Sequence, residues 1–187
     1  MIDILKKLYT SQELAEYYAY EDTTAFDVGI ILAINENEFA LQSFSINGNR
    51  GGIVAYTTNN IFKVQTNTKY IDKIKKLSDN ISLSDTAKEI NKNAIFNSLL
   101  QISQKNKTVL SITLLANDNE DFTGFVEEIN NNNCKFRIID EYGYNDGFVY
   151  FKTNDITELA YMCDKECRFM KLWEMNHTVM QGDGPVL

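Results

Sequence analysis

The sequence predicts a mainly β protein with α-helices, in which two small, strongly bent β-barrels follow each other and each is headed by a helix. Three observations lead to this fold class. Residues in the second half of the chain repeat those in the first at a constant offset of 95 positions. Turn residues recur roughly every 8–12 positions between short apolar runs, as in small barrels and sandwiches. Apolar residues at three- and four-residue steps precede each set of runs and indicate helices.

The repeat is the strongest of these signals. Residues 29–77 align with residues 124–172 without a gap. Chance would give about three identical pairs over this length, so the larger number found indicates an internal duplication. We therefore expect a first unit at residues 1–80, a second at 81–175 and a C-terminal tail at 176–187. The identical pairs are Gly29/Gly124, Ile34/Ile129, Asn35/Asn130, Asn37/Asn132, Gly48/Gly143, Gly52/Gly147, Val54/Val149, Thr58/Thr153, Asn59/Asn154, Ile61/Ile156, Lys76/Lys171 and Leu77/Leu172.

The first copy begins with a predicted helix, because Ile2, Leu5 and Leu8 lie at helical spacing. An aromatic stretch at 17–20 then starts a strand. A hairpin is expected at Asn47-Gly48, a dipeptide that favours tight turns. The spacing of Ile61 and Val64 predicts a short helical turn before the last strand. Further strands are expected at 29–34, 39–44, 53–56 and 61–64, with turns at 21–24, 35–38 and 58–60.

The second copy repeats this order. The steps between Ala87, Ile90, Leu99 and Ile102 predict one helix over about residues 84–104. Clean alternation over residues 134–138 predicts a strand with Lys135 and Arg137 facing outward. Each copy is thus expected to be a helix and five strands in meander order. The remaining strands of the second copy are expected at 108–115, 125–129, 148–152 and 156–162, with turns at 117–121, 130–133 and 142–147.

Composition argues against several functions. The formal net charge is −8, so the protein repels phosphate backbones and anionic membranes at long range. No run of about 18 apolar residues is present, and the N-terminus lacks the pattern of a secretory signal. Three cysteines do not make a disulfide framework. We therefore expect a bacterial cytoplasmic protein that is not associated with membranes.

The order of elements resembles that of the Sm-like (LSm) family of small β-barrels. The resemblance consists of a helix before five bent strands, of Gly29 and Gly124 in the second strand of each copy, and of a polar, glycine-containing hairpin before the fourth strand. It also includes the steps Asn59-Asn60-Ile61 and Asn154-Asp155-Ile156 into the fifth strand. Such proteins form rings by pairing the fourth strand of one barrel with the fifth of the next, and many bind RNA. The resemblance therefore implies that the two units of this chain pair in that way.

The RNA-binding residues of that family are not found here. Its bacterial members carry a Tyr-Lys-His motif near the last strands, but residues 56–61 and 151–156 contain no histidine. The Arg-Gly or Lys-Gly step of the eukaryotic members is also missing at these positions. No binding residue is carried over from the family.

Other candidate residues do not form a catalytic or metal-binding pattern. His177 is the single histidine and lies beyond the repeat, so we expect an ordinary surface residue. Cys163, Cys167 and His177 could be imagined as zinc ligands, but their spacing is unusual and no fourth ligand is evident. Cys134 occupies the position of Phe39, which predicts a core residue. We expect no cofactor and no metal.

Two surfaces remain as candidates for binding. The aromatic side chains Tyr142, Tyr144, Tyr150 and Trp173 are concentrated in the second copy, where they either form an interaction surface or cover the joint between the units. On a helix, Lys69, Lys73 and Lys76 share a face, where phosphate contact is conceivable and a solvated face is the simpler interpretation.

The leading hypothesis is a non-enzymatic interaction or assembly module with a protein partner or self-association. The alternative is an Sm-like RNA-binding protein, which the net charge disfavours. A third possibility, an enzyme, requires a pocket between the two units with convergent carboxylates.

Overall fold

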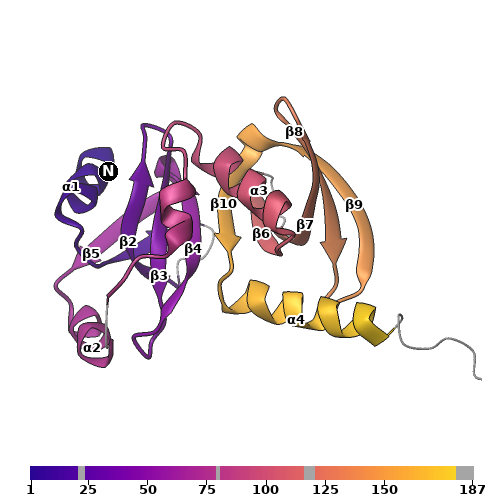
Figure 1. Ribbon diagram of the computed structural model, residues 1–187. Helices are drawn as coiled ribbons and strands as arrows, with labels where there is room; N and C mark the ends of the chain where they lie inside the picture. Colours follow the sequence, from indigo (N-terminus) through magenta and orange to yellow (C-terminus); the bar gives the residue numbers. More distant parts are fainter. Residues whose placement is uncertain (21–23, 79–80, 116–120, 180–187) are drawn as a thin grey trace, which may run out of the picture.

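The computed structural model describes residues 1–20, 24–78, 81–115 and 121–179 (Figure 1). The turns expected at 21–24 and 117–121 lie largely outside these residues, and so do residues 180–187 of the expected tail. The first half contains α1 (Ile2–Ser11), β1 (Ala15–Ala19), β2 (Asp27–Ile34), β3 (Glu38–Phe44), β4 (Arg50–Thr57), a 3-10 turn (Thr58–Asn60), β5 (Ile61–Thr66) and α2 (Lys69–Leu77).

The second half repeats this order after a connecting 3-10 turn, Asp85–Glu89. Its last helix is longer than the corresponding helix of the first half and reaches Val179, so it enters the region expected as a tail. The second half contains α3 (Ile95–Asn106), β6 (Leu110–Leu114), β7 (Asp121–Asn130), β8 (Asn133–Ile139), β9 (Asn145–Lys152), a 3-10 turn (Thr153–Asp155), β10 (Ile156–Tyr161) and α4 (Asp164–Val179).

The strand pairing confirms that the two halves are structural repeats. Ala15 lies opposite Gly29 in the first half, and Leu110 lies opposite Gly124 in the second. The pairing of β2 with β3 shifts register after Ile31, and that of β7 with β8 shifts after Val126, its counterpart at the same offset of 95. The bends in the sheet therefore recur at equivalent positions.

All ten strands form one antiparallel sheet in the order β5-β1-β2-β3-β4-β10-β6-β7-β8-β9. The fifth strand of each half departs from the expected meander, because it returns to pair with the first strand of its half. The halves join where β4 pairs with β10, with Ala55 opposite Leu159 and Val54 opposite Ala160. The two outermost strands of the sheet are therefore β5 and β9.

The helix expected over residues 84–104 is corrected by the structure. Residues 85–89 form a 3-10 turn, the chain is extended at Ile90, and the α-helix begins only at Ile95. The carboxylate of Glu38, in the first half, accepts hydrogen bonds from the backbone N–H groups of Ile95 (2.7 Å) and Phe96 (3.3 Å). The start of α3 is thus set by a contact between the halves.

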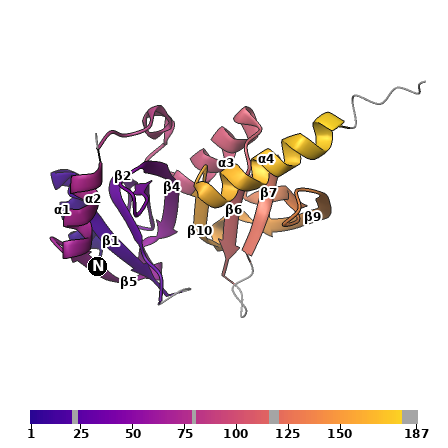
Figure 2. The same cartoon turned by 90° about the horizontal axis from the view of Figure 1, so that it is seen from below.

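The core is continuous across the joint. Ala33, Ala40 and Ala55 of the first half pack in one buried cluster with Phe96 and Leu100 of α3. The first half has two further clusters, one beneath α1 and one beneath α2. Figure 2 shows α3 and α4 beside the sheet of the second half, with α1 and α2 at the far end of the molecule. Within the described residues, no helix is both long enough and apolar enough to cross a bilayer.

Candidate functional site

One face of the sheet, called here the outer face, is covered in the first half and largely open in the second. In the first half, Ile30 lies opposite Gln42, which lies opposite Ile53, and all three side chains are buried. They are buried because this face is covered from three sides. Helix α2 packs on Ile30, residues 82–84 pass beside Gln42, and α3 packs on the neighbouring alanines.

The same face of the second half is largely open. The equivalent row is Phe125, Arg137 and Phe148, and the next row includes Lys135 opposite Tyr150. Phe148 is 47% exposed and Tyr150 is 71% exposed. The ammonium group of Lys135 lies 4.5 Å from the ring centre of Phe148. The outward direction of Lys135 and Arg137 follows the expected alternation, because the alternate residues Cys134 and Phe136 are buried.

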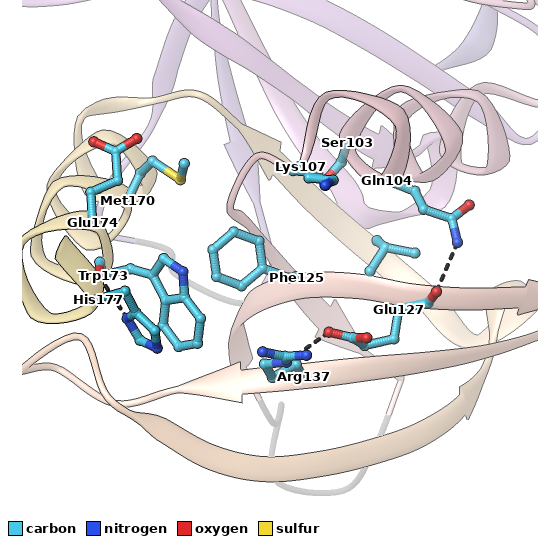
Figure 3. Close-up of a pocket in the computed structure, with 11 residues that line it drawn as sticks. Ser103, Gln104, Lys107, Phe125, Glu127, Arg137, Met170, Trp173, Glu174 and His177 are labelled. Atoms are coloured by element: carbon cyan, nitrogen blue, oxygen red, sulfur yellow. Dashed lines mark hydrogen bonds and ion pairs between the residues drawn. The ribbon is translucent and has the colours of Figure 1, made fainter. Parts of the chain in front are cut away.

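A groove of about 630 Å³ lies on this open face between α3 and α4 (Figure 3). Its floor is apolar, with the rings of Phe125 and Trp173 5.0 Å apart. The guanidinium group of Arg137 lies 5.6 Å from the ring of Trp173, and its Nε is 2.7 Å from Oε1 of Glu127. The groove is lined by Ser103, Gln104, Lys107, Phe125, Val126, Glu127, Arg137, Met170, Trp173, Glu174 and His177.

The expected aromatic surface is only partly one surface. Trp173 lies in the groove, and Tyr150 lies on the open sheet face. Tyr142 and Tyr144 belong to the hairpin between β8 and β9 and are 65% and 51% exposed. That hairpin is held to α4, because the side chain of Asn176 donates to the carbonyl groups of Tyr142 (2.9 Å) and Gly143 (3.1 Å).

Sequence reasoning missed Phe125 and Phe148 as surface residues. Their counterparts Ile30 and Ile53 are also apolar, so the pattern gives no sign that one pair is buried and the other open. The signal that could have found the groove is the length of the last helix. Residues 173–179 continue α4, whereas α2 stops at Leu77.

The expected lysine face exists on α2. Lys69, Lys73 and Lys76 are exposed and line one shallow depression of about 420 Å³ together with Asp72 and Leu77. Asp72 places a negative charge among the lysines, which weakens the attraction for phosphate. Within the described part of the chain, no second feature beside this depression points to a ligand.

The cysteines and His177 do not come together in one site within the described residues. The imidazole of His177 stacks on Trp173, with 3.7 Å between ring centres, and it is exposed at the rim of the groove. Burial raises the pKa of the Cys134 thiol to about 12. Burial also raises the pKa of Cys163 and of Cys167, and neighbouring carboxylates raise both further. These thiols are therefore protonated at neutral pH, which does not suit a nucleophile. Among the described residues, no cluster of such side chains is arranged to hold a metal ion.

A smaller pocket, of about 200 Å³, lies at the joint and brings carboxylates together. Burial raises the pKa of Asp27, although the hydroxyl of Tyr56 donates to its carboxylate. Burial likewise raises the pKa of Glu166, which accepts a hydrogen bond from Ser111. An enzyme would require a pocket between the two units with convergent carboxylates, and this pocket meets that requirement in part. Typical ligand pockets have volumes of about 300–1,000 Å³, and this pocket is smaller. The groove beside Trp173 is therefore the better candidate site.

Comparison with known proteins adds no assignment. No family model matches the chain, and no curated protein matches its sequence. Among solved structures, the chain is weakly similar to one described as the crystal structure of YcgR in complex with c-di-GMP from Escherichia coli. The identity is 8%, the aligned part covers 96% of this chain and 89% of that chain, and the TM-score is 0.19. At this TM-score the similarity carries no argument about fold or function.

Proposed function

We propose that this protein is a non-enzymatic cytoplasmic assembly module made of two Sm-like units, which associates through the two outermost strands of its sheet. The Sm-like assignment is supported by the order of a helix and five strands, and by the return of the fifth strand to the first in each half. The assembly role is supported by one observation above all: the two halves are themselves joined by a fourth strand, β4, pairing with a fifth strand, β10.

The sheet ends in the matching pair of strands. The free fourth strand is β9 and the free fifth strand is β5, at opposite ends of the ten-stranded sheet. An open edge presents unpaired backbone groups that favour strand addition, and isolated proteins usually protect such edges. The outermost strand β9 carries the exposed apolar side chains of Phe148 and Tyr150, with the charged residues Asp146 and Lys152 toward its ends. Two copies can therefore be joined by repeating the pairing that joins the halves.

The register of this contact follows from the repeat. Leu159 of β10 lies opposite Ala55 of β4, and their counterparts at the offset of 95 are Val64 and Tyr150. We therefore expect Val64 of one copy to lie opposite Tyr150 of the next. The faces beside the strands differ, because Ala33, Ala40 and Ala55 are replaced by Glu128, Lys135 and Tyr150. Helix α1 of a second copy cannot approach this face as closely as α3 approaches the alanines, so the strand edges carry most of the contact.

A disulfide tests both association and register. In a Cys167→Ser background, Val64→Cys with Tyr150→Cys is expected to give cross-linked dimers and higher species on mild oxidation. The bond can only form between copies, because β5 and β9 are the two ends of the sheet. Val64→Cys with Asn145→Cys is the matched control, since both positions lie on the same two strands but out of register.

Light scattering of the unmodified protein is the companion measurement. We expect the mean mass to rise with concentration. A strictly monomeric species, with no cross-linking above the control and no protein recovered in a pull-down, would remove the proposal.

RNA binding is the second candidate, and one observation favours it. Lys135 lies on the open sheet face between the exposed rings of Phe148 and Tyr150, with its ammonium 4.5 Å from the first and 6.0 Å from the second ring centre. Cations beside stacking rings are typical of single-strand binding, whereas the net charge of −8 opposes it. A mobility shift with pooled RNA at low salt that Lys135→Gln removes is the expected sign of this function. The absence of any shift at micromolar protein would end the idea.

A further inference from the structure

In the first half, an extended segment of the chain itself covers the strip of sheet beside α2. The backbone N–H of Ser84 donates to Oε1 of Gln42 at 2.9 Å. Nη1 of Arg50 donates to the carbonyl of Leu83 at 3.2 Å and to the hydroxyl of Ser82 at 3.3 Å. The strip is thus a peptide-binding surface whose peptide, residues 82–84, comes from the same chain.

The same strip is open in the second half for a structural reason. Leu77 is the last residue of α2, and Ser84 lies beside Gln42. Its counterpart Leu172 lies in the middle of α4, which continues to Val179. No segment within the described residues returns across β8, and the groove of about 630 Å³ lies beside Arg137, the counterpart of Gln42.

We propose that this groove binds an extended, acidic peptide segment of a partner protein, which contacts Arg137 as residues 82–84 contact its counterpart Gln42 in the first half. The site is separate from the β5 and β9 edges, so this inference does not depend on the proposed self-association. The apolar floor of Phe125, Met170 and Trp173 accepts one large apolar side chain of the peptide.

The polar residues of the groove define the rest of the ligand. Gln42, which accepts a peptide N–H in the first half, is replaced by Arg137, which can only donate. A peptide in the second half must therefore present an oxygen atom here. Lys107 lines the groove from the end of α3 and has no carboxylate within ion-pair distance in the described part of the chain. Both positions favour an aspartate or glutamate in the bound segment.

A long polyanion fits this groove less well than a short acidic segment does. Glu127 and Glu174 also line it, and Glu127 is paired with Arg137 at 2.7 Å. A phosphate backbone would meet these carboxylates along its length, whereas a peptide places one carboxylate between the two cations. The groove therefore favours a peptide over single-stranded nucleic acid.

Trp173 makes the test direct, because it is the only tryptophan in the chain and lies in the groove. A library of displayed random decapeptides is selected on the full-length protein, and the enriched peptides are synthesised and titrated while the emission of Trp173 is recorded. We expect peptides that combine one large apolar residue with Asp or Glu and that shift this emission. Arg137→Gln is expected to weaken their binding at least tenfold, as loss of a charged hydrogen-bond donor does.

Two further variants keep the result decisive. Arg168→Gln is the matched control, since Arg168 is exposed on the same helix α4 and does not line the groove. It should bind the peptides as the unmodified protein does. Met170→Asp places a carboxylate on the apolar floor, where it opposes both the apolar side chain and the acidic residue of the peptide, and should also weaken binding tenfold, even where Arg137→Gln fails to fold. The assignment is overturned if no selected peptide alters Trp173 emission, if neither groove variant weakens binding, or if pooled single-stranded RNA shows the expected variant dependence in place of the peptides.

Discussion

At the scale of single residues, the hairpin glycines show what the duplication has kept. Gly48 and Gly143 have φ angles of 77° and 82°, in the left-handed region that glycine favours. A Cβ atom at Gly143 would also lie 2.6 Å from Cβ of Leu172 on α4, and one at Gly48 would lie 3.0 Å from Cβ of Leu77 on α2. Each half therefore uses a glycine and a leucine, both identical between the copies, to fix a hairpin against its last helix.

Gly143→Ala should cost more stability than Gly147→Ala. Both residues have positive φ angles, 82° and 95°, so each alanine carries a backbone cost of about 1–2 kcal/mol. Only position 143 adds a clash with α4, because a Cβ at 147 meets nothing within 4 Å. We expect a total of roughly 2–5 kcal/mol at 143. Urea denaturation followed by Trp173 fluorescence measures both, and equal losses would show that the contact with Leu172 contributes nothing.

A buried carboxylate has changed place between the halves. In the first half Glu16, on β1, accepts from the hydroxyl of Thr68 at the start of α2. In the second half Ser111 occupies the strand position, and Glu166 of α4 accepts from it. The alignment did not reveal this exchange, because Glu16 pairs with Ser111 and Glu166 pairs with Ile71 in separate columns.

Glu166→Gln should stabilise the protein at pH 7. Burial raises the pKa of Glu166 in the folded state, so folding is penalised once the carboxylate is charged in the unfolded chain. The penalty is absent below the ordinary pKa of about 4.3, where both states are protonated, and grows as the pH rises toward the folded-state value. We expect a gain on the order of 1–3 kcal/mol at pH 7 that disappears near pH 4. A gain that is independent of pH would mean that the charge is not its cause.

At the scale of secondary structure, local patterns predicted most strands, and contacts between residues far apart in the sequence decided what they missed. The hairpins, the strand order up to the fourth strand and the short helical turn before the fifth were all readable, because turn residues and alternation act locally. The partner of the fifth strand was not, since pairing with the first strand is a long-range contact. The helix expected at 84–104 was too long because its periodic residues continue through Ile90, which is buried in the core without being helical.

Glu38→Ala should shorten or weaken α3. Its carboxylate bonds the N–H groups of Ile95 and Phe96, which the helix itself cannot satisfy. Loss of a cap of this kind costs about 0.5–2 kcal/mol. Glu36→Ala is the control, since Glu36 is exposed and makes one surface ion pair with Lys6, which contributes little. Hydrogen exchange of the first turn of α3 should quicken only in Glu38→Ala, and unchanged protection there would contradict the capping role.

At the scale of the whole molecule, the open face around the candidate groove depends on which segments lie over each half of the sheet. Ile30 and Ile53 of the first half and Phe125 and Phe148 of the second are apolar at equivalent positions, but the segments that cover them differ. The cover of the first half consists of a helix from the neighbouring half and of the chain between the halves, so it exists once. The duplication was predictable from the identities between the copies. The open face of the second half was not, because β9 is an outermost strand and no neighbouring repeat places a helix over it in the described part of the chain.

One sheet and one shared core should make the molecule unfold as a unit. Ala55 is fully buried at the joint, and its counterpart Tyr150 is 71% exposed on the free edge. Ala55→Asp places an unpaired charge in the shared cluster and should cost at least about 3 kcal/mol of stability. Tyr150→Asp should change stability by about 0.5 kcal/mol or less in the monomer.

Trp173 fluorescence reports the unfolding of the second half alone, and far-UV circular dichroism reports the unfolding of both halves. In Ala55→Asp we expect both signals to move together to lower urea, because β10 and α3 lose their packing when β4 is disturbed. Two separate transitions in the unmodified protein would show instead that each half carries its own stability, and the joint would then be a docking contact between independent units.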